Sequence, residues 1–315
     1  MRYIEAGGTR WSAFTLGTVQ LGMDYGLGDD RAKPSEEKAF TVLDTAAECG
    51  VDHLDTANNY GDAERVIGHW LARRRAAGLP LPRITTKIGP FDHTSPDALR
   101  DDMLRQTEKS LKTLGLETFD CLMLHNYADF SSNPDETRRF LEKMRAEGVC
   151  RRIAVSLYAD DDYRLVARSG FDAVQIPQNV FDWRQIESGG IEALKDAGML
   201  IFVRSVFLQG LVYRTPETLA PRMSFAAPYL RRYLDLARDF GLEPGVLALS
   251  FVLSLPGVTS AVMGCDNAEQ AAQNAALFER TVTLAPAQMD ALRSAFADID
   301  PRVPDPRRWF NSGRQ

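Results

Sequence analysis

Four side chains in the first half of the chain are of types that together can reduce a carbonyl group: Asp55, Tyr60, Lys87 and His125. A tyrosine hydroxyl has an ordinary pKa of about 10, and a nearby ammonium group lowers that pKa. Asp55 could hold Lys87 charged and directed at Tyr60, which would then donate a proton to a carbonyl oxygen. His125 could hydrogen-bond the same oxygen and orient it. The reaction also needs a hydride, so the four residues together predict a redox cofactor.

Taken singly, each residue has an ordinary interpretation. Lys87 could be a solvated charge, His125 a hydrogen-bonded structural residue, and Asp55 a turn cap before Thr56. Their shared position argues for function, because Asp55, Lys87 and His125 each stand at the end of a short apolar run. In a parallel barrel such ends converge on one mouth, where active sites are found.

Eight short apolar runs predict the strands that position these residues. They are Ala13–Leu16, Val51–Asp55, Arg83–Lys87, Phe119–Leu124, Ile153–Leu157, Ala173–Ile176, Leu200–Arg204 and Ser260–Met263. Amphipathic stretches that predict helices lie between them and after the last: 35–49, 62–77, 95–114, 133–147, 160–168, 191–197, 226–240 and 267–278. Alternating strands and helices in a chain of this size predict one closed (β/α)8 TIM barrel, an α/β fold, formed as a single domain by residues 1–315.

Three segments lie outside this alternation. Met1–Arg10 contains Gly7 and Gly8 between short strand-like pieces, which predicts a β-hairpin. Ser205–Phe225 and the proline-containing tail after Ile299 are long and irregular. Long loops on a rigid barrel usually carry function, so we expect these two segments near the active site, on the C-terminal face of the barrel.

Composition and charge limit the classes of partner that the protein could bind. The 315 residues are 44% hydrophobic and 25% charged, with a net charge of −6 and no basic stripe, which argues against nucleic acid as a partner. We see neither a signal peptide nor a run of about 20 apolar residues, so we expect a cytoplasmic protein without a membrane partner. The four cysteines are far apart, as expected for reduced core thiols. The sequence does not indicate an oligomeric state.

The segment Asp55–Gly68 resembles the signature of the aldo-keto reductases, Asp-Thr-Ala-x-x-Tyr-Gly-x-Ser-Glu, with Ala63 where serine is usual. Leu16-Gly17-Thr18 is similar to the motif of the family's first strand, and the resemblance extends over nearly the whole chain. It implies an NAD(P)(H)-dependent oxidoreductase that acts on an aldehyde or ketone, or on the corresponding alcohol. It also implies that Asp55, Tyr60, Lys87 and His125 form the family's catalytic tetrad.

The resemblance further implies which residues contact the nicotinamide end of NAD(P)H. Ser156 and Gln175 match contacts to the nicotinamide amide, whereas Leu157 replaces the usual asparagine. Arg204 and Ser205 stand where many members have a tyrosine stacked on the nicotinamide ring. A guanidinium plane could stack there instead, or Arg204 could face the substrate. Gly17 and Thr18 complete the expected contacts at this end.

At the adenosine end of the cofactor, the residues that match the family's contacts are Gly264, Gln270 and Asn274, together with the N-terminus of the last predicted helix. The segment Met263–Gln270 contains no Lys or Arg, and Asp266 stands where several members bind the extra phosphate of NADP. We therefore expect NAD(H) to be used at least as well as NADP(H). Two alternatives remain open, because Asp266 or Asn267 could simply cap the helix, and a cation such as Arg280 could reach the phosphate.

Two other functions remain as alternatives: a regulatory module that binds the cofactor with little turnover, and a Schiff-base lyase that uses Lys87. The substrate is less defined. Polar groups at Asn58, Asn126 and Arg204 favour a polar carbonyl such as a sugar. Aromatic residues that could line the mouth are Tyr25, Tyr127, Phe181, Trp183 and Phe207.

Overall fold

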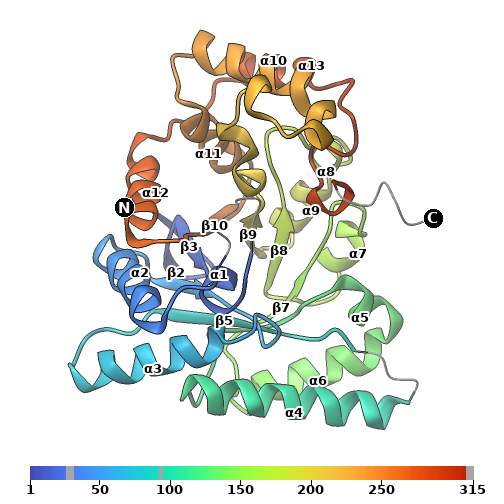
Figure 1. The fold of residues 1–315 in the computed structure, drawn as a ribbon. Coiled ribbons are helices and arrows are strands. Elements are labelled where there is room, and N and C mark those ends of the chain that lie inside the picture. Colours follow the sequence, from blue (N-terminus) through green and yellow to red (C-terminus); the bar gives the residue numbers. More distant parts are fainter. Residues whose placement is uncertain (26–31, 92–94, 310–315) are drawn as a thin grey trace.

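The computed structural model describes residues 1–25, 32–91 and 95–309, and its centre is a closed barrel of parallel strands (Figure 1). The hydrogen-bonded order is β10-β3-β4-β5-β6-β7-β8-β9. The strands are β3 (Phe14–Gly17), β4 (His53–Asp55), β5 (Arg83–Ile88), β6 (Cys121–Leu124), β7 (Ile153–Ser156), β8 (Ala173–Pro177), β9 (Leu200–Arg204) and β10 (Val258–Gly264). Each predicted apolar run contributes one strand, so the predicted (β/α)8 barrel is confirmed.

Helices surround this barrel (Figure 1). They are α1 (Val19–Gly22), α2 (Glu36–Glu48), α3 (Ala63–Ala76), α4 (Pro96–Leu114), α5 (Tyr127–Ser132), α6 (Pro134–Ala146), α7 (Tyr163–Ala167), α8 (Arg184–Glu187), α9 (Gly190–Asp196), α10 (Ala227–Asp239), α11 (Pro244–Ser254), α12 (Ala268–Arg280) and α13 (Pro286–Ala295). The segment 205–225 and the tail contain 3-10 turns: η1 (Leu208–Tyr213), η2 (Pro216–Thr218), η3 (Pro221–Ala226) and η4 (Pro306–Arg308). Among the described helices, none has both the length and the apolar character needed to cross a bilayer.

Short polar residues begin several of these helices. The Ser35 side chain accepts a hydrogen bond from the backbone N–H of Lys38 at 3.4 Å, and the Ser95 side chain caps α4 in the same way. Gly115 ends α4 in the left-handed region, with a φ of 63°. A side chain there would be strained, which explains why a glycine separates this helix from the next strand.

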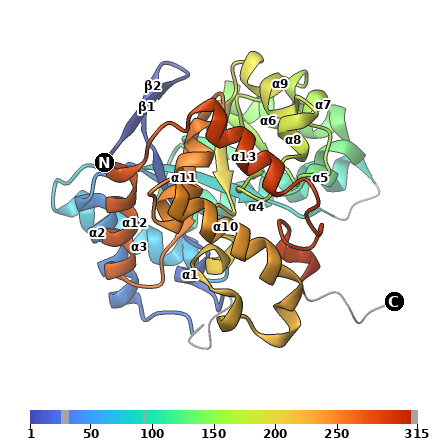
Figure 2. The same cartoon turned by 90° about the horizontal axis from the view of Figure 1, so that it is seen from above.

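The N-terminal hairpin closes one end of the barrel. Strands β1 (Tyr3–Ala6) and β2 (Thr9–Ser12) pair antiparallel and project beside the barrel (Figure 2), which confirms the predicted hairpin. Trp11 is only 1% exposed and meets the rings of His53 and Phe202 edge-on, at centroid distances of 5.1 and 5.5 Å. It therefore packs inside the barrel, at the end where the strands begin.

Alternation along the strands determines which side chains reach the barrel interior. On β5, Thr85 faces inward and hydrogen-bonds Nε2 of His53 at 2.8 Å. Its neighbour Thr86 faces outward and donates to Glu64 of α3 at 2.6 Å. Asp55 and Lys87 lie two residues beyond His53 and Thr85, so they face inward near the C-terminal ends of β4 and β5. The fold thus brings the predicted tetrad to one mouth.

Candidate active site

Asp55 and Lys87 form a buried ion pair at the ends of β4 and β5. Nζ of Lys87 lies 2.5 Å from Oδ1 of Asp55 and 3.1 Å from the carbonyl oxygen of Thr56, and the lysine side chain is 0% exposed. The second Asp55 oxygen accepts from Nε2 of Gln175 at 2.8 Å. Both carboxylate oxygens are therefore engaged, which fixes the ammonium group in place.

Tyr60 lies in the turn that joins β4 to α3. Its backbone N–H donates to Ala57 at 3.1 Å, and its carbonyl oxygen accepts from Ala63 at 3.0 Å. Helix α1 packs so closely on this turn that a Cβ on Gly22 would overlap the Tyr60 carbonyl. Gly61 adopts a positive φ of 55° facing the Gly22 carbonyl. The two glycines therefore allow the close approach that positions Tyr60.

Charge and burial act in opposite directions on Lys87 and Tyr60. Burial alone lowers the pKa of Lys87, but the charges of Asp55 and Tyr60 outweigh burial, so the pKa is raised and the ammonium form persists. Burial raises the pKa of Tyr60, against the opposing effect of Lys87, whose Nζ lies 5.1 Å from the centre of the tyrosine ring. The expectation that Lys87 lowers this pKa holds for its own contribution, but the net shift is upward because desolvation dominates.

His125 follows β6 and is neutral. Its backbone N–H donates to Ile88 at 2.9 Å, and its ring meets the Tyr60 ring edge-on with centroids 5.5 Å apart. Burial, together with the positive charges of Lys87 and Arg204, lowers the pKa of His125 to about 3. Its buried Nδ1 has no hydrogen-bond partner among the described residues. A neutral imidazole beside Tyr60 can donate a hydrogen bond from its N–H group to a carbonyl oxygen.

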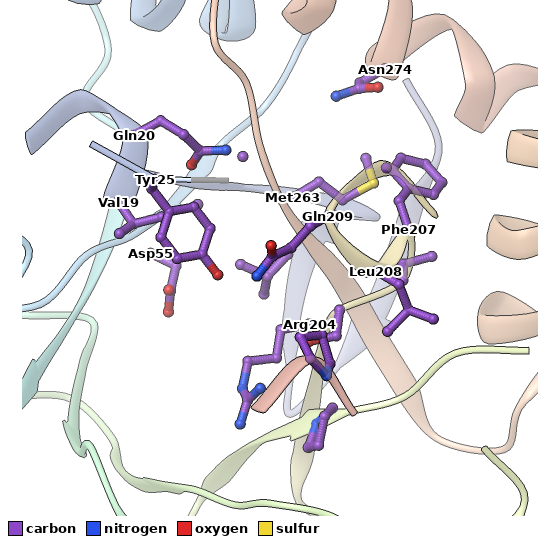
Figure 3. A pocket seen from close by; sticks show the side chains of 18 of the residues that line it. Val19, Gln20, Tyr25, Asp55, Arg204, Phe207, Leu208, Gln209, Met263 and Asn274 are labelled. Atoms are coloured by element: carbon purple, nitrogen blue, oxygen red, sulfur yellow. The ribbon is translucent and has the colours of Figure 1, made fainter. Parts of the chain in front are cut away.

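A cavity of about 1100 Å³ opens on this cluster. At one end it is lined by Asp55, Tyr60 and Arg204, and Figure 3 shows Asp55 and Arg204 directed into it. The other end is lined by β10 and α12, where Figure 3 shows Asn274. One continuous cavity therefore joins the predicted catalytic end to the predicted adenosine end, and it is large enough for a cofactor and a substrate.

The residues predicted at the catalytic end divide into two groups. Gly17, Thr18, Gln175, Arg204 and Ser205 line the cavity. Lys87, His125 and Ser156 are not among the described residues that line it. Thr18 donates both its backbone N–H and its hydroxyl to the Asp55 carbonyl oxygen, at 3.0 and 2.9 Å. It therefore supports the backbone that carries Asp55.

The far end of the cavity contains the residues predicted for adenosine. Gly264, Asp266, Gln270 and Asn274 all line it. The Asn267 side chain caps α12 by accepting from the Gln270 backbone N–H at 2.9 Å, so the cap is Asn267 and not Asp266. The carboxylate of Asp266 is exposed and has no partner among the described residues.

The family follows from the sequence match. Residues 13–296 match the model of the Aldo/keto reductase family. The chain belongs to this family. It is 26% identical over 296 residues to the L-glyceraldehyde 3-phosphate reductase of Escherichia coli (strain K12), with 84% of each chain covered. It is 25% identical over 273 residues to the D-threo-aldose 1-dehydrogenase of Pseudomonas sp, covering 76% of this chain and 83% of the relative.

The fold agrees with a solved member. The holo form of an aldo-keto reductase from Bacillus halodurans superimposes with a TM-score of 0.74 at 22% identity, over 94% of this chain and 96% of that one. The aldo-keto reductase described here is thus an oxidoreductase that interconverts small carbonyl compounds and alcohols with a nicotinamide cofactor.

Several lining residues of this aldo-keto reductase were not predicted. Gln20, Tyr158 and Arg307 line the cavity. Gln20 follows the first strand and Tyr158 the fifth, whereas Arg307 lies in the tail, a segment that was expected near the site without any single residue being named. Only the position of Tyr158 directly after a strand could have indicated it. Of the predicted aromatic residues, Tyr25 and Phe207 line the cavity, whereas Phe181 is buried against Tyr233 and Phe296.

Proposed function

We propose that this protein reduces a polar aldehyde or ketone with Tyr60 as the proton donor, and oxidises the corresponding alcohol in reverse. The observation that carries the proposal is the buried chain of contacts from Gln175 through Asp55 to Lys87, which ends beneath the Tyr60 ring. It supplies a fixed positive charge at the point where the tyrosine loses its proton.

Each residue has a defined part in that proposal. Tyr60 gives its proton to the carbonyl oxygen as the carbonyl carbon receives the hydride, so the product is a neutral alcohol. Lys87 stabilises the phenolate that remains, and Asp55 holds Lys87. Neutral His125 donates a hydrogen bond that orients the carbonyl oxygen.

The cavity fits a dinucleotide cofactor, which would supply the hydride when bound. A buried acceptor, Oε1 of Gln20, has no partner among the described residues and faces Gly264, where a Cβ would overlap the glutamine amide. Gln175 must turn its NH₂ group toward the Asp55 carboxylate, because a carboxylate only accepts. Its amide oxygen then remains to accept a hydrogen bond from the nicotinamide amide, as the sequence predicted.

The preference between the two nicotinamide cofactors belongs to the proposal as well. Asp266 at the adenosine end would repel a ribose phosphate and could accept from a free 2′-hydroxyl. Arg280, the alternative cation, also lines the cavity, but its Nη2 lies 2.6 Å from Glu243 and its charge is offset. NAD(H) is therefore proposed to be used at least as well as NADP(H).

A Schiff-base role for Lys87 is disfavoured, because a nucleophilic lysine must be neutral and the pKa of Lys87 is raised. An experiment can distinguish the proposed carbonyl reductase from a regulatory module with little turnover. NADH and NADPH oxidation should be followed over a panel of sugars, aromatic aldehydes and ketones, with Tyr60→Phe as the inactive control. A cofactor that binds without turnover on any member of the panel would favour the regulatory module.

A cytoplasmic location remains a prediction from the sequence.

A further inference from the structure

One arginine beside the catalytic groups forms no ion pair with a carboxylate of the described residues, although the Asp161 carboxylate is close enough to interact with its charge. Within the described part of the chain, five arginines line the cavity: Arg184, Arg204, Arg214, Arg280 and Arg307. Three of them are ion-paired at 2.6 Å, with Asp182, Glu243 and Asp305. Arg204 and Arg214 form no ion pair with a carboxylate of the described residues, and Arg214 is exposed directly after η1. Arg204 is the one that is half-buried near Tyr60.

The Arg204 guanidinium is held in a fixed orientation. One Nη2–H group donates to the carbonyl oxygen of Leu157 at 2.8 Å. The guanidinium carbon lies 4.8 Å from the centre of the Tyr158 ring, so one face of the group is covered by that ring. Two contacts therefore orient the planar group before any ligand binds, and N–H groups remain along its edge.

This edge reaches the catalytic end of the cavity. Figure 3 shows the Arg204 side chain extending into the space that Asp55 also faces. Its charge is close enough to lower the pKa of both Tyr60 and His125. A substrate bound in this cavity could therefore contact Arg204 with one group while its carbonyl is positioned at Tyr60.

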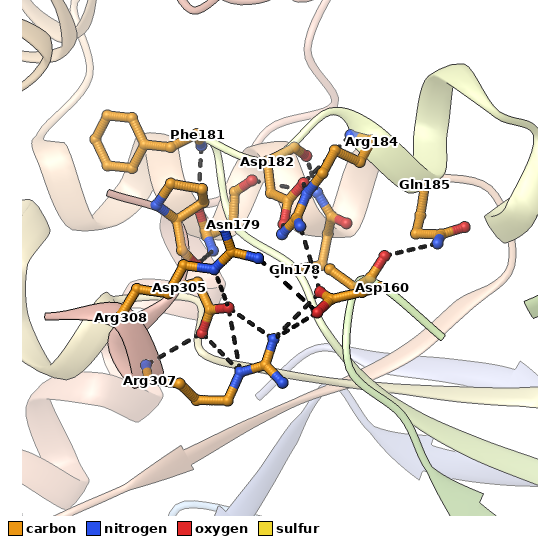
Figure 4. A network of polar contacts seen from close by, with 12 residues as sticks. Asp160, Gln178, Asn179, Phe181, Asp182, Arg184, Gln185, Asp305, Arg307 and Arg308 are labelled. Atoms are coloured by element: carbon orange, nitrogen blue, oxygen red, sulfur yellow. Dashed lines mark hydrogen bonds and ion pairs between the residues drawn. The ribbon is translucent and has the colours of Figure 1, made fainter. Parts of the chain in front are cut away.

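Arg307 also lies over the Tyr158 ring and can be compared with Arg204. Its guanidinium carbon lies 3.8 Å from the Tyr158 ring centre, closer than that of Arg204. Figure 4 shows Arg307 between Asp160 and Asp305, which it contacts at 3.2 and 2.6 Å. Two carboxylates therefore offset its charge, so of the two arginines on the Tyr158 ring only Arg204 is without an ion pair among the described residues.

We infer that Arg204 binds a carboxylate carried by the carbonyl substrate, so the substrate class is an aldehyde or keto acid. The inference rests on the proposed function and adds the chemistry of the substrate. A guanidinium edge matches the two oxygens of a carboxylate, and its planar geometry makes that contact selective. Stacking of Arg204 on the nicotinamide ring is the competing role, and the ring of Tyr158 already occupies one of its two faces.

Matched substrate pairs test this assignment. We would measure kcat and KM for succinate semialdehyde and 4-carboxybenzaldehyde against their methyl esters, in wild type, Arg204→Gln, Arg204→Lys and Arg307→Gln. A hydrogen bond to a charged group predicts a loss of roughly 10- to 100-fold in kcat/KM for the acids in Arg204→Gln, mainly through KM. The esters should lose less than the acids, so the ratio of kcat/KM for acid to that for ester falls in Arg204→Gln, and Arg204→Lys should recover part of this ratio. Arg307→Gln should affect acid and ester equally.

Three results would overturn the assignment. Equal losses for acid and ester in Arg204→Gln would make Arg204 a general contributor to catalysis, and a raised KM for the cofactor would place it on the nicotinamide. If kcat/KM in Arg204→Gln fell more for glyceraldehyde 3-phosphate than for the acids, the group that Arg204 binds would be a phosphate and not a carboxylate. Succinate binding to the enzyme–cofactor complex, followed by calorimetry, gives a readout without turnover. If no carbonyl is reduced but succinate binding still depends on Arg204, the proposed function fails while the anion site stands.

Discussion

Gln175 and Lys87 bind opposite oxygens of one buried carboxylate, Asp55, at 2.8 and 2.5 Å. The three residues come from β8, β5 and β4, so the contact chain crosses the barrel mouth. Both oxygens of this carboxylate are hydrogen-bonded, and the interaction with Asp55 raises the pKa of Lys87 against the effect of burial. The effect of the ion pair on stability and its effect on the pKa of Tyr60 can therefore be measured separately.

Lys87→Met should reduce both stability and activity. It leaves Asp55 buried without its cation, which typically costs about 3–5 kcal/mol of unfolding free energy. It also removes the charge that opposes the raised pKa of Tyr60. Alcohol oxidation requires the ionised tyrosine, so the rise of its rate with pH should move to higher pH in the variant. Urea unfolding and the pH–rate profile measure the two effects.

The double variant Asp55→Asn/Lys87→Met is the control for this prediction. It removes both charges, so most of the lost stability should return, whereas activity should not. An unchanged pH profile with near-normal turnover in Lys87→Met would show that the lysine does not act on Tyr60.

Tyr60→Phe should abolish carbonyl reduction while cofactor binding stays nearly intact. The substitution removes the proton donor but keeps the ring that packs against His125. General acid catalysis contributes roughly 10²–10⁴-fold, so turnover should fall by that order. Steady-state kinetics and cofactor fluorescence titration check the two halves. A variant that keeps more than about a tenth of wild-type turnover would exclude Tyr60 as the acid.

His125 should make stability depend on pH in the acid range. Its pKa is about 3 in the folded protein, against an ordinary histidine value of 6.5, so between these values the unfolded chain binds more protons. Unfolding free energy therefore falls as pH decreases through this window, by about 1.4 kcal/mol per pH unit for one histidine. Between pH 7 and pH 5 the wild type should lose about 2 kcal/mol more than His125→Gln, measured by urea unfolding. Parallel curves for the two proteins would contradict the lowered pKa.

The sequence predicts the barrel well because its strands and most helices carry strong periodic patterns. Helix α11 was missed, since residues around its whole circumference are buried and no amphipathic stripe marks it. The segment after Ser205 was expected only to be irregular. Ser205, which precedes its first 3-10 turn η1, and Leu208 and Gln209 within η1 adopt positive φ angles, which are uncommon for residues other than glycine.

At the site, the predicted tetrad is brought together because its strand-end positions fix where each residue lies. The direction of the net pKa shift of Tyr60 was not predictable, because desolvation depends on everything packed around the ring. Arg307 was missed for another reason. Its place in the cavity depends on ion pairs with Asp160 and Asp305, and Asp160 is 147 residues away along the chain.

Asp266→Arg should shift cofactor use toward NADPH. Asp266 is exposed at the adenosine end, and Asn267 rather than Asp266 caps α12, so the substitution leaves the cap in place. The change replaces a repelling charge with one that attracts the ribose phosphate of NADP. In the wild type, kcat/KM for NADH should at least equal that for NADPH on one substrate, and the variant should favour NADPH. Asp266→Asn is the matched control, because it removes the repulsion without adding a cation. A wild-type preference for NADPH above about tenfold, or about 1.4 kcal/mol, would show that Arg280 or another cation binds the phosphate despite Asp266.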